Sequence, residues 1–90
     1  MSIKIYIPLP LHKHTNEQHV VEVNGGTVSE CLDNLAKQYP DIGKKLFKKN
    51  GELHSYLDIF VNKLAVYPEG LSKPVKDGDD LHILFLIAGG

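Results

Sequence analysis

Apolar and other residues alternate at the start of the chain. Residues 3–9 have isoleucine or leucine at every odd position, separated by lysine, tyrosine and proline. This period of two predicts a strand with one buried face. Because Pro8 and Pro10 have no N–H to donate, the strand is expected to lose its pairing on that side near position 8. A polar loop at 12–18 and a second strand at 19–23 would complete a β-hairpin.

The clearest helix signal follows the glycine pair at 25–26. Thr27 and Glu30 match a capping box, in which the threonine hydroxyl accepts from the N–H of residue 30 and Glu30 reaches back to the N–H of Thr27. Apolar residues then recur at spacings of three and four, which is typical of a helix with one buried stripe. They are Val28, Leu32, Leu35, Ala36 and Tyr39, with Cys31 beside them. Pro40 disfavours helical geometry for the preceding residue and is expected to end the helix.

Further elements are predicted in the second half of the chain. A short helical turn is expected within 41–49, with Ile42, Leu46 and Phe47 inward. Alternation predicts strands at 56–62 and 64–67, and the apolar stretch 81–86 reads as a central strand. The strand after the helix is expected to lie parallel beside the first hairpin. The order of elements indicates a two-layer α+β domain. A mixed sheet of four to five strands on one main helix is the β-grasp, or ubiquitin-like, arrangement.

Composition narrows the classes of function. The 90 residues include ten lysines, no arginine and eleven acidic residues, for a formal net charge of −1. Nucleic acids and anionic membranes both require basic surfaces, so neither is the expected partner. The single cysteine, Cys31, excludes an internal disulfide and a multi-cysteine metal site. No apolar run approaches the ~20 residues of a membrane span, and no secretory signal is apparent, so a cytoplasmic protein is expected.

Three features receive mainly structural interpretations. His12, His14 and His19 fall in or beside the predicted polar loop, and an exposed loop is favoured over a metal site. Cys31 is expected to be a buried apolar filler, since its neighbours Glu30 and Asp33 oppose thiolate formation. The one cluster of like charges is either a solvated face or a docking patch for an acidic partner. It consists of Lys44, Lys45, Lys48 and Lys49.

The sequence ends on Ala88, Gly89 and Gly90. Two given positions are both glycine in about one random sequence in two hundred. A glycine pair contributes nothing to a core and adds conformational entropy to the unfolded chain. It does let a partner enzyme close tightly around the backbone, which favours a tail whose terminal carboxylate is a substrate. Because a carboxylate is a poor electrophile, ATP would first convert it to an acyl adenylate. A sulfur nucleophile would then displace AMP and leave a thiocarboxylate.

The chain resembles the ubiquitin-like sulfur carriers of the MoaD/ThiS family over essentially its whole length. The resemblance rests on the order of elements, on the turn PVKDGDDL at 74–81 and on the ending LIAGG at 86–90. The segment GELHSYLDIFVN at 51–62 and the opening IPLPL at 7–11 resemble most the branch that delivers sulfide to a cysteine synthase, the CysO type. That branch has an arginine in its first strand where this chain has none.

The resemblance implies one β-grasp domain at 1–87, a flexible tail at 88–90, and a protein that is not an enzyme. Gly90 would be the site of the adenylate and the thiocarboxylate, with Gly89 and Ala88 threaded into the partner. No cofactor or metal is expected on this chain, since ATP is used by an E1-like (MoeB/ThiF-type) adenylating enzyme. The other implied partners are a sulfurtransferase or other sulfur donor, and an acceptor. The acceptor would be a cysteine synthase first and the molybdopterin synthase large subunit second. Thiamin biosynthesis is another route for the sulfur after cysteine biosynthesis. A JAMM-type metalloprotease is a further partner.

Phe60, Leu84 and Leu86 are expected on the outer face of the sheet, away from the helix. An exposed apolar patch beside the tail would serve as the docking surface for the activating and acceptor enzymes. The alternative is that the loop at 68–80 covers that face. Two other functions stay open: a ubiquitin-like modifier joined through Gly90 to target lysines, and a non-covalent ubiquitin-like interaction domain with an inert tail.

Overall fold

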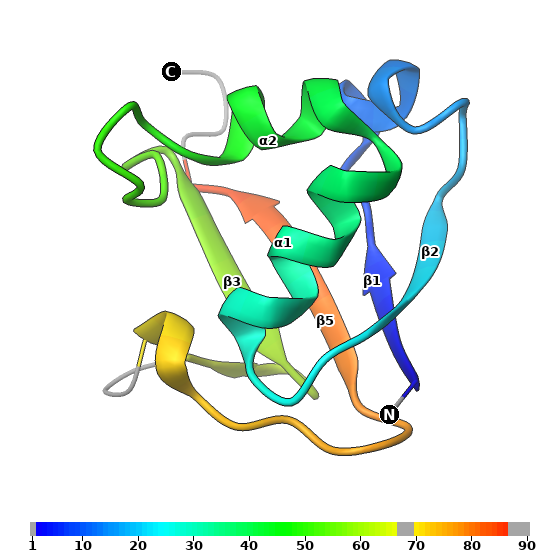
Figure 1. Ribbon diagram of the computed structural model, residues 1–90, viewed down its shortest axis with the longest axis vertical. Helices are drawn as coiled ribbons and strands as arrows, with labels where there is room; N and C mark the ends of the chain where they lie inside the picture. The colour runs from blue at the N-terminus through cyan, green and yellow to red at the C-terminus, as the bar shows by residue number, and fades with distance from the viewer. Residues whose placement is uncertain (1, 67–69, 87–90) are drawn as a thin grey trace.

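The computed structural model describes residues 2–66 and 70–86, in which a mixed sheet packs against helices on one face (Figure 1). The strands are β1 (Ser2–Tyr6), β2 (Val20–Asn24), β3 (Leu57–Val61), β4 (Leu64–Ala65) and β5 (Asp80–Phe85). The α-helices are α1 (Val28–Gln38) and α2 (Pro40–Leu46), and the 3-10 helices are η1 (Leu9–His14) and η2 (Gly70–Ser72). The strand order β2-β1-β5-β3-β4, with α1 across the sheet, confirms the predicted β-grasp fold.

The last strand, β5, lies in the middle of the sheet. It pairs parallel with β1 and antiparallel with β3, so that Leu81 lies beside Ile5 and Ile83 beside Ile59. This central position agrees with its apolar sequence. The prediction that the strand after the helix is the parallel neighbour of the hairpin is wrong. That strand, β3, pairs with β5 and β4, because β5 takes the position beside β1.

The core lies between the inner face of the sheet and the two α-helices. Alternate strand residues and most of the helix stripe are buried, as the periodicity predicts, whereas Ala36 and Tyr39 of the predicted stripe are half-buried. The fully buried hydrophobic residues are Ile3, Ile5, Ile59, Leu81, Ile83, Val28, Cys31, Leu32, Leu35, Ile42 and Leu46. Each large aliphatic side chain contributes about 1.5–3 kcal/mol by leaving water. All α-helical residues lie on one side, so the other face of the sheet is available for a different role.

Of the two hydrogen bonds predicted for the capping box, one is present as expected and the other has a different donor. The N–H of Glu30 donates to the Thr27 hydroxyl at 3.2 Å. The Glu30 carboxylate, however, accepts from the N–H of Gly26 at 2.7 Å, one residue before the expected Thr27. The C-terminal end of the helix agrees with the prediction, since α1 ends at Gln38 and Pro40 opens α2.

The first strand is shorter than predicted, and the loop after it is largely helical. β1 ends at Tyr6, and Leu9 is 78% exposed. The N–H of Leu11 donates to Pro8 O at 2.9 Å, because the prolines favour a helical turn over a continued ladder. The expectation that His12 lies in an exposed loop is wrong. Its side chain is buried, with Nε2 2.7 Å from Ile7 O.

The segment after β4 packs on the helix side of the sheet. The N–H of Val28 donates to Lys73 O, and the N–H of Val75 donates to Gly26 O, both at 3.0 Å. This part of the loop therefore lies along the N-terminus of α1 and does not cover the outer face. β4 has two residues where four were predicted, and Tyr67 lies outside the described residues. Across 2–66 and 70–86, no helix is long and apolar enough to cross a membrane.

Candidate functional site

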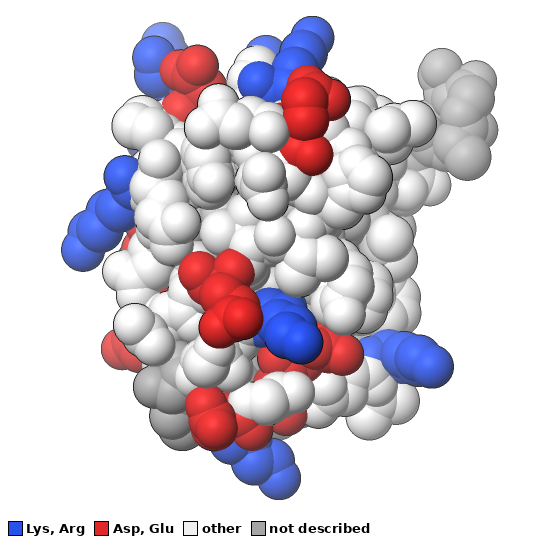
Figure 2. Space-filling model, turned by 90° about the vertical axis from the view of Figure 1, so that its right-hand side faces the viewer, with Lys and Arg blue, Asp and Glu red and all other residues white. Residues whose placement is uncertain are grey.

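A row of mostly apolar and aromatic side chains crosses the outer face of the sheet. The strand register aligns Val20, Tyr6, His82, Phe60 and Ala65 on five successive strands. The Tyr6 and His82 rings stack with centroids 4.3 Å apart and planes 2° from parallel. Figure 2, seen from the β2 side, shows charged side chains along the top, at the left and in the lower half, with uncharged side chains between them. Charged residues border the row on the same face, namely Lys4, Glu22, Asp58 and Asp80. An exposed row of this kind is suited to contact with another protein.

The described residues predicted for docking lie at this row or just beyond it. Phe60 is half-buried within the row. Leu84 follows His82 on the same face of β5 and is 43% exposed, and Leu86 is 58% exposed just after the strand. The prediction that Phe60 and Leu84 point away from the helices is confirmed by the strand register and burial. Ala88, Gly89 and Gly90, the predicted tail residues, lie outside the described residues.

Sequence reasoning missed that Tyr6 and His82 belong to the same surface. Alternation indicates that each points away from the core, but only strand pairing brings the two together. The Nδ1 atom of His82 is buried and has no hydrogen-bond partner within 2–66 and 70–86. The His82 ring contributes to this surface through its stacking on Tyr6.

The chain leaves β5 beside a second group of aromatic residues. The N–H of Leu86 donates to Tyr56 O at 2.8 Å. The Tyr56 ring stacks on Phe85 at a centroid distance of 5.8 Å and on His54 at 4.8 Å. Its hydroxyl donates to Lys45 O at 3.3 Å. The end of β5 is thus connected to the start of β3 and to α2. We call Lys45, His54, Tyr56 and Phe85, which surround Leu86, the tail base.

An apolar hollow also lies next to the tail base. It has a volume of about 410 Å³, and its lining includes Leu57, Val66, Leu71 and Leu86. Leu57 and Val66 belong to the core, whereas Leu86 is exposed. Leu86 therefore both lines this hollow and directly follows the end of β5.

The Asp77-Gly78-Asp79 turn has a structural explanation. Gly78 adopts φ 89°, a conformation that suits glycine. The Asn62 amide donates to Asp79 Oδ1, and the N–H of Lys76 donates to Asp79 Oδ2, both at 2.9 Å. These hydrogen bonds, the Asn62 bond foremost, hold the pKa of the Asp79 carboxyl below its usual value. The turn joins the β3–β4 connection to the start of β5 and thereby fixes where the central strand begins.

Cys31 is a core residue. Its side chain is completely buried in α1, as predicted. Burial, followed by the nearby charge of Glu30, raises the pKa of the thiol to about 11. The thiol therefore stays protonated at neutral pH and is a poor nucleophile. Among the described residues, no group of three or more His, Cys, Asp or Glu side chains could hold a metal ion.

A β-grasp domain with a row of apolar and aromatic side chains across its outer sheet face and an exposed leucine after its central strand is typical of the class of ubiquitin-like carrier proteins. The chain belongs to the ThiS family, which it matches over residues 5–90. It is a sulfur carrier and not an enzyme.

Individual relatives agree with this assignment. The chain is 33% identical to the sulfur carrier protein CysO of Mycobacterium tuberculosis over 93 aligned residues, which cover 100% of both proteins. A chain in the crystal structure of the Amycolatopsis orientalis BexX/CysO complex is 37% identical, with a TM-score of 0.89 and coverage of 98% of this chain and 99% of that chain. Small archaeal modifier protein 1 from Methanosarcina acetivorans is 25% identical, with a TM-score of 0.86 and coverage of 99% and 96%.

Proposed function

We propose that this chain carries sulfur as a thiocarboxylate on Gly90 and donates it for cysteine biosynthesis. The observation that carries the proposal is the similarity to the sulfur carrier CysO across the full length of both proteins. The family match that extends to residue 90 supports a role for the tail. In this proposal residues 1–87 form the carrier domain, and residues 88–90 are the segment that enters a partner's active site.

The chemistry takes place at the carboxylate of Gly90. One carboxylate oxygen attacks the α-phosphorus of ATP, which releases pyrophosphate and leaves an acyl adenylate. A sulfide-level nucleophile then attacks the carbonyl carbon, AMP departs, and the terminus becomes –CO–SH. Gly89 and Ala88 carry at most one methyl group each, so a narrow channel can enclose their backbone. An E1-like (MoeB/ThiF-type) adenylating enzyme binds the ATP, and a sulfurtransferase or other donor supplies the sulfur.

The outer face serves as the docking surface in this scheme. Phe60, Leu84 and Leu86 make the apolar contact, together with the stacked rings of Tyr6 and His82. Gly90 lies four residues beyond Leu86, so a fully extended tail reaches at most about 14 Å from it. An enzyme that acts on Gly90 must therefore contact the surface around the tail base.

The acceptor in this proposal is a cysteine synthase, and the molybdopterin synthase large subunit comes second. The thiocarboxylate sulfur becomes bonded to the acceptor's substrate while the carbonyl of Gly90 stays attached. A JAMM-type metalloprotease then hydrolyses the bond that joins the product to the carrier. The similarity to CysO favours the cysteine route.

A second function is conjugation to target proteins. The observation that favours it is the likeness to small archaeal modifier protein 1. Both functions begin with adenylation of Gly90, but a modifier ends in an isopeptide bond to a lysine. A non-covalent interaction domain, in contrast, would keep its function after deletion of residues 89–90.

The intact mass of the protein distinguishes these functions. The protein is purified from its native host without a C-terminal tag. A carrier should show the mass gain of one oxygen replaced by sulfur, and deletion of Gly90 should abolish this gain. Higher-mass conjugates that resist reduction and denaturation would instead support the modifier. An unmodified mass, unchanged after ATP, sulfide and the cognate adenylating enzyme are supplied, would exclude both.

A further inference from the structure

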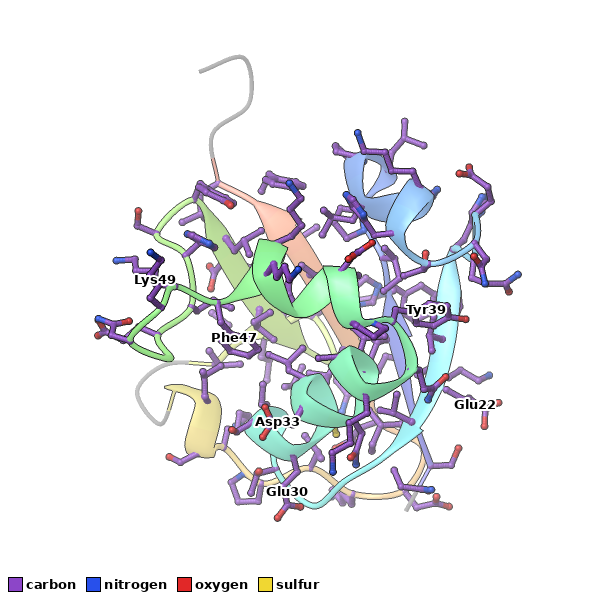
Figure 3. All side chains as sticks on the ribbon, turned by 45° about the horizontal axis from the view of Figure 1, so that its top comes forward. Glu22, Glu30, Asp33, Tyr39, Phe47 and Lys49 are labelled. Atoms are coloured by element: carbon purple, nitrogen blue, oxygen red, sulfur yellow. The ribbon has the colours of Figure 1, made fainter. Side chains whose placement is uncertain are left out.

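A hollow on α2 and the segment after it has an apolar floor and a basic rim. Its volume is about 550 Å³. Pro40, Gly43 and Phe47 contribute apolar surface, and the polar rim consists of Lys44, Lys48, Lys49 and His54. Phe47 packs partly buried against the core, whereas the three lysines are exposed. In Figure 3, Lys49 lies at the periphery and Phe47 nearer the body of the molecule.

Basic charge is concentrated around this hollow. Residues 40–54 contain four lysines and two acidic residues, whereas the rest of the chain contains six lysines and nine acidic residues. The acidic residues Glu30 and Asp33 lie in the N-terminal half of α1, away from Lys49 in Figure 3. Within 2–66 and 70–86, none of the rim lysines forms an ion pair with a carboxylate. Their charge is therefore available to a partner.

His54 connects the hollow to the tail base. Its ring stacks on Tyr56 with centroids 4.8 Å apart, and Tyr56 O accepts the N–H of Leu86. The hollow, through His54, and the outer sheet face, through Leu84, therefore both lie near the point where the chain leaves β5. Because the extended tail reaches only about 14 Å beyond Leu86, an enzyme bound to Gly90 comes close to both surfaces.

We infer that this hollow receives an acidic segment of the adenylating enzyme. One apolar side chain of that segment rests on Phe47, and flanking carboxylates pair with Lys44, Lys48 and Lys49. An acidic protein segment fits better than nucleic acid, because the rest of the chain carries excess negative charge and would repel phosphates. The inference rests on the proposed function, since it names a second contact made by the enzyme that acts on Gly90.

We expect the rim lysines to affect the rate at which the two proteins associate more than the rate of the chemical step. Exposed ion pairs contribute little to stability one by one. Several lysines on one face nevertheless steer an acidic partner and raise its association rate in a salt-dependent way. Disruption of the rim should therefore raise KM and leave kcat nearly unchanged.

The test compares two charge-reversal pairs. Lys44→Glu with Lys48→Glu alters the rim, and Lys37→Glu with Lys63→Glu alters exposed lysines that do not line the hollow. Each protein is titrated into the E1-like adenylating enzyme of the same organism with ATP, at low and at physiological salt, and pyrophosphate release is measured. We expect the rim pair to lower kcat/KM about tenfold or more at low salt, through KM, and to weaken its salt dependence. The control pair should stay close to the wild type.

Each outcome has a distinct meaning. Equal losses in the two pairs would assign the effect to net charge and overturn the inference. A rim pair that behaves like the wild type would also overturn it, while the proposed function would stand. A wild-type protein that the enzyme does not adenylate would overturn the proposed function and the inference with it. Thermal unfolding of all variants verifies that the exposed substitutions leave the fold intact.

Discussion

The N–H of Leu86 donates a 2.8 Å hydrogen bond to the carbonyl of Tyr56, one residue beyond the end of β5. This bond extends the antiparallel pairing of β5 with β3 to the last described residue. The aromatic ring of Tyr56 lies between His54 and Phe85, and its hydroxyl reaches Lys45 O on α2. A single tyrosine therefore joins the end of β5 to the segment before β3 and to α2.

Replacement of Tyr56 should separate the effect of its ring from that of its hydroxyl. Tyr56→Ala removes both stacking contacts and should lower the free energy of unfolding by about 1–3 kcal/mol. Tyr56→Phe keeps the rings stacked and loses one hydrogen bond, so a loss below about 1 kcal/mol is expected. Urea denaturation measures both values. Equal losses would show that the hydroxyl, and not the stack, stabilises the tail base.

Exposed leucines should differ in how well they tolerate a charge, according to whether they lie on the outer face of the sheet. Leu84→Lys introduces a charge beside Phe60 and His82, opposite Asp58 in the register. We expect the rate of Gly90 adenylation by the cognate enzyme to fall about tenfold or more, because the interface would bury that charge. Leu64→Lys is the matched control, since Leu64 is also an exposed leucine but lies on the edge strand β4. A similar loss in both variants would contradict a docking surface centred on Leu84.

Gly25 is required by the close approach of β2 to α1. A Cβ at this position would lie 2.7 Å from Cys31 Sγ and 2.9 Å from Cys31 N. Gly25→Ala should therefore destabilise the protein by about 1–3 kcal/mol through overpacking. Gly43→Ala in α2 is the comparison. Its Cβ would lie 3.2 Å from a single atom, the Ala36 Cβ, and alanine favours a helix. Thermal unfolding should show a clear loss for Gly25→Ala and little or none for Gly43→Ala.

The Asp79 turn predicts a small acid-dependent effect. The Asn62 hydrogen bond lowers the pKa of Asp79 in the folded state below its ordinary 3.8. Its contribution to stability is therefore present above pH 3.8 and is lost as the pH falls through the lower, folded-state pKa. Asn62→Gly keeps the positive φ of 49° accessible and removes the amide. The pKa of Asp79, followed by carboxyl-carbon NMR, should rise toward 3.8.

A second variant separates the causes of this pKa shift. Lys76→Gln removes only a nearby charge, while the backbone N–H of Lys76 still donates to Asp79. It should raise the pKa of Asp79 less than Asn62→Gly does, because the Asn62 hydrogen bond is the largest cause. A larger rise in the lysine variant would mean that charge, and not the amide, holds the carboxylate ionised.

Predictions from the local sequence pattern succeeded where the residues that determine a feature all lie in one short segment. Thr27 and Pro40 mark the ends of α1 because capping and proline geometry act within a few residues. Phe60 and Leu84 point away from the core because alternation depends only on position along a strand. The same reasoning failed at His12, since the burial of its ring depends on Ile7 O and on packing that no local pattern contains.

By itself, the sequence determined the helix stripe, the inward and outward faces of the strands, and the family to which the chain is similar. Tertiary structure alone decided that β5 lies between β1 and β3, which brings Tyr6, His82 and Phe60 into one row. It also brought the backbone carbonyl of Lys45 in α2 to the hydroxyl of Tyr56. The physical reason is that periodicity specifies which face of an element is buried, whereas strand order and ring stacking depend on contacts between residues far apart in the chain.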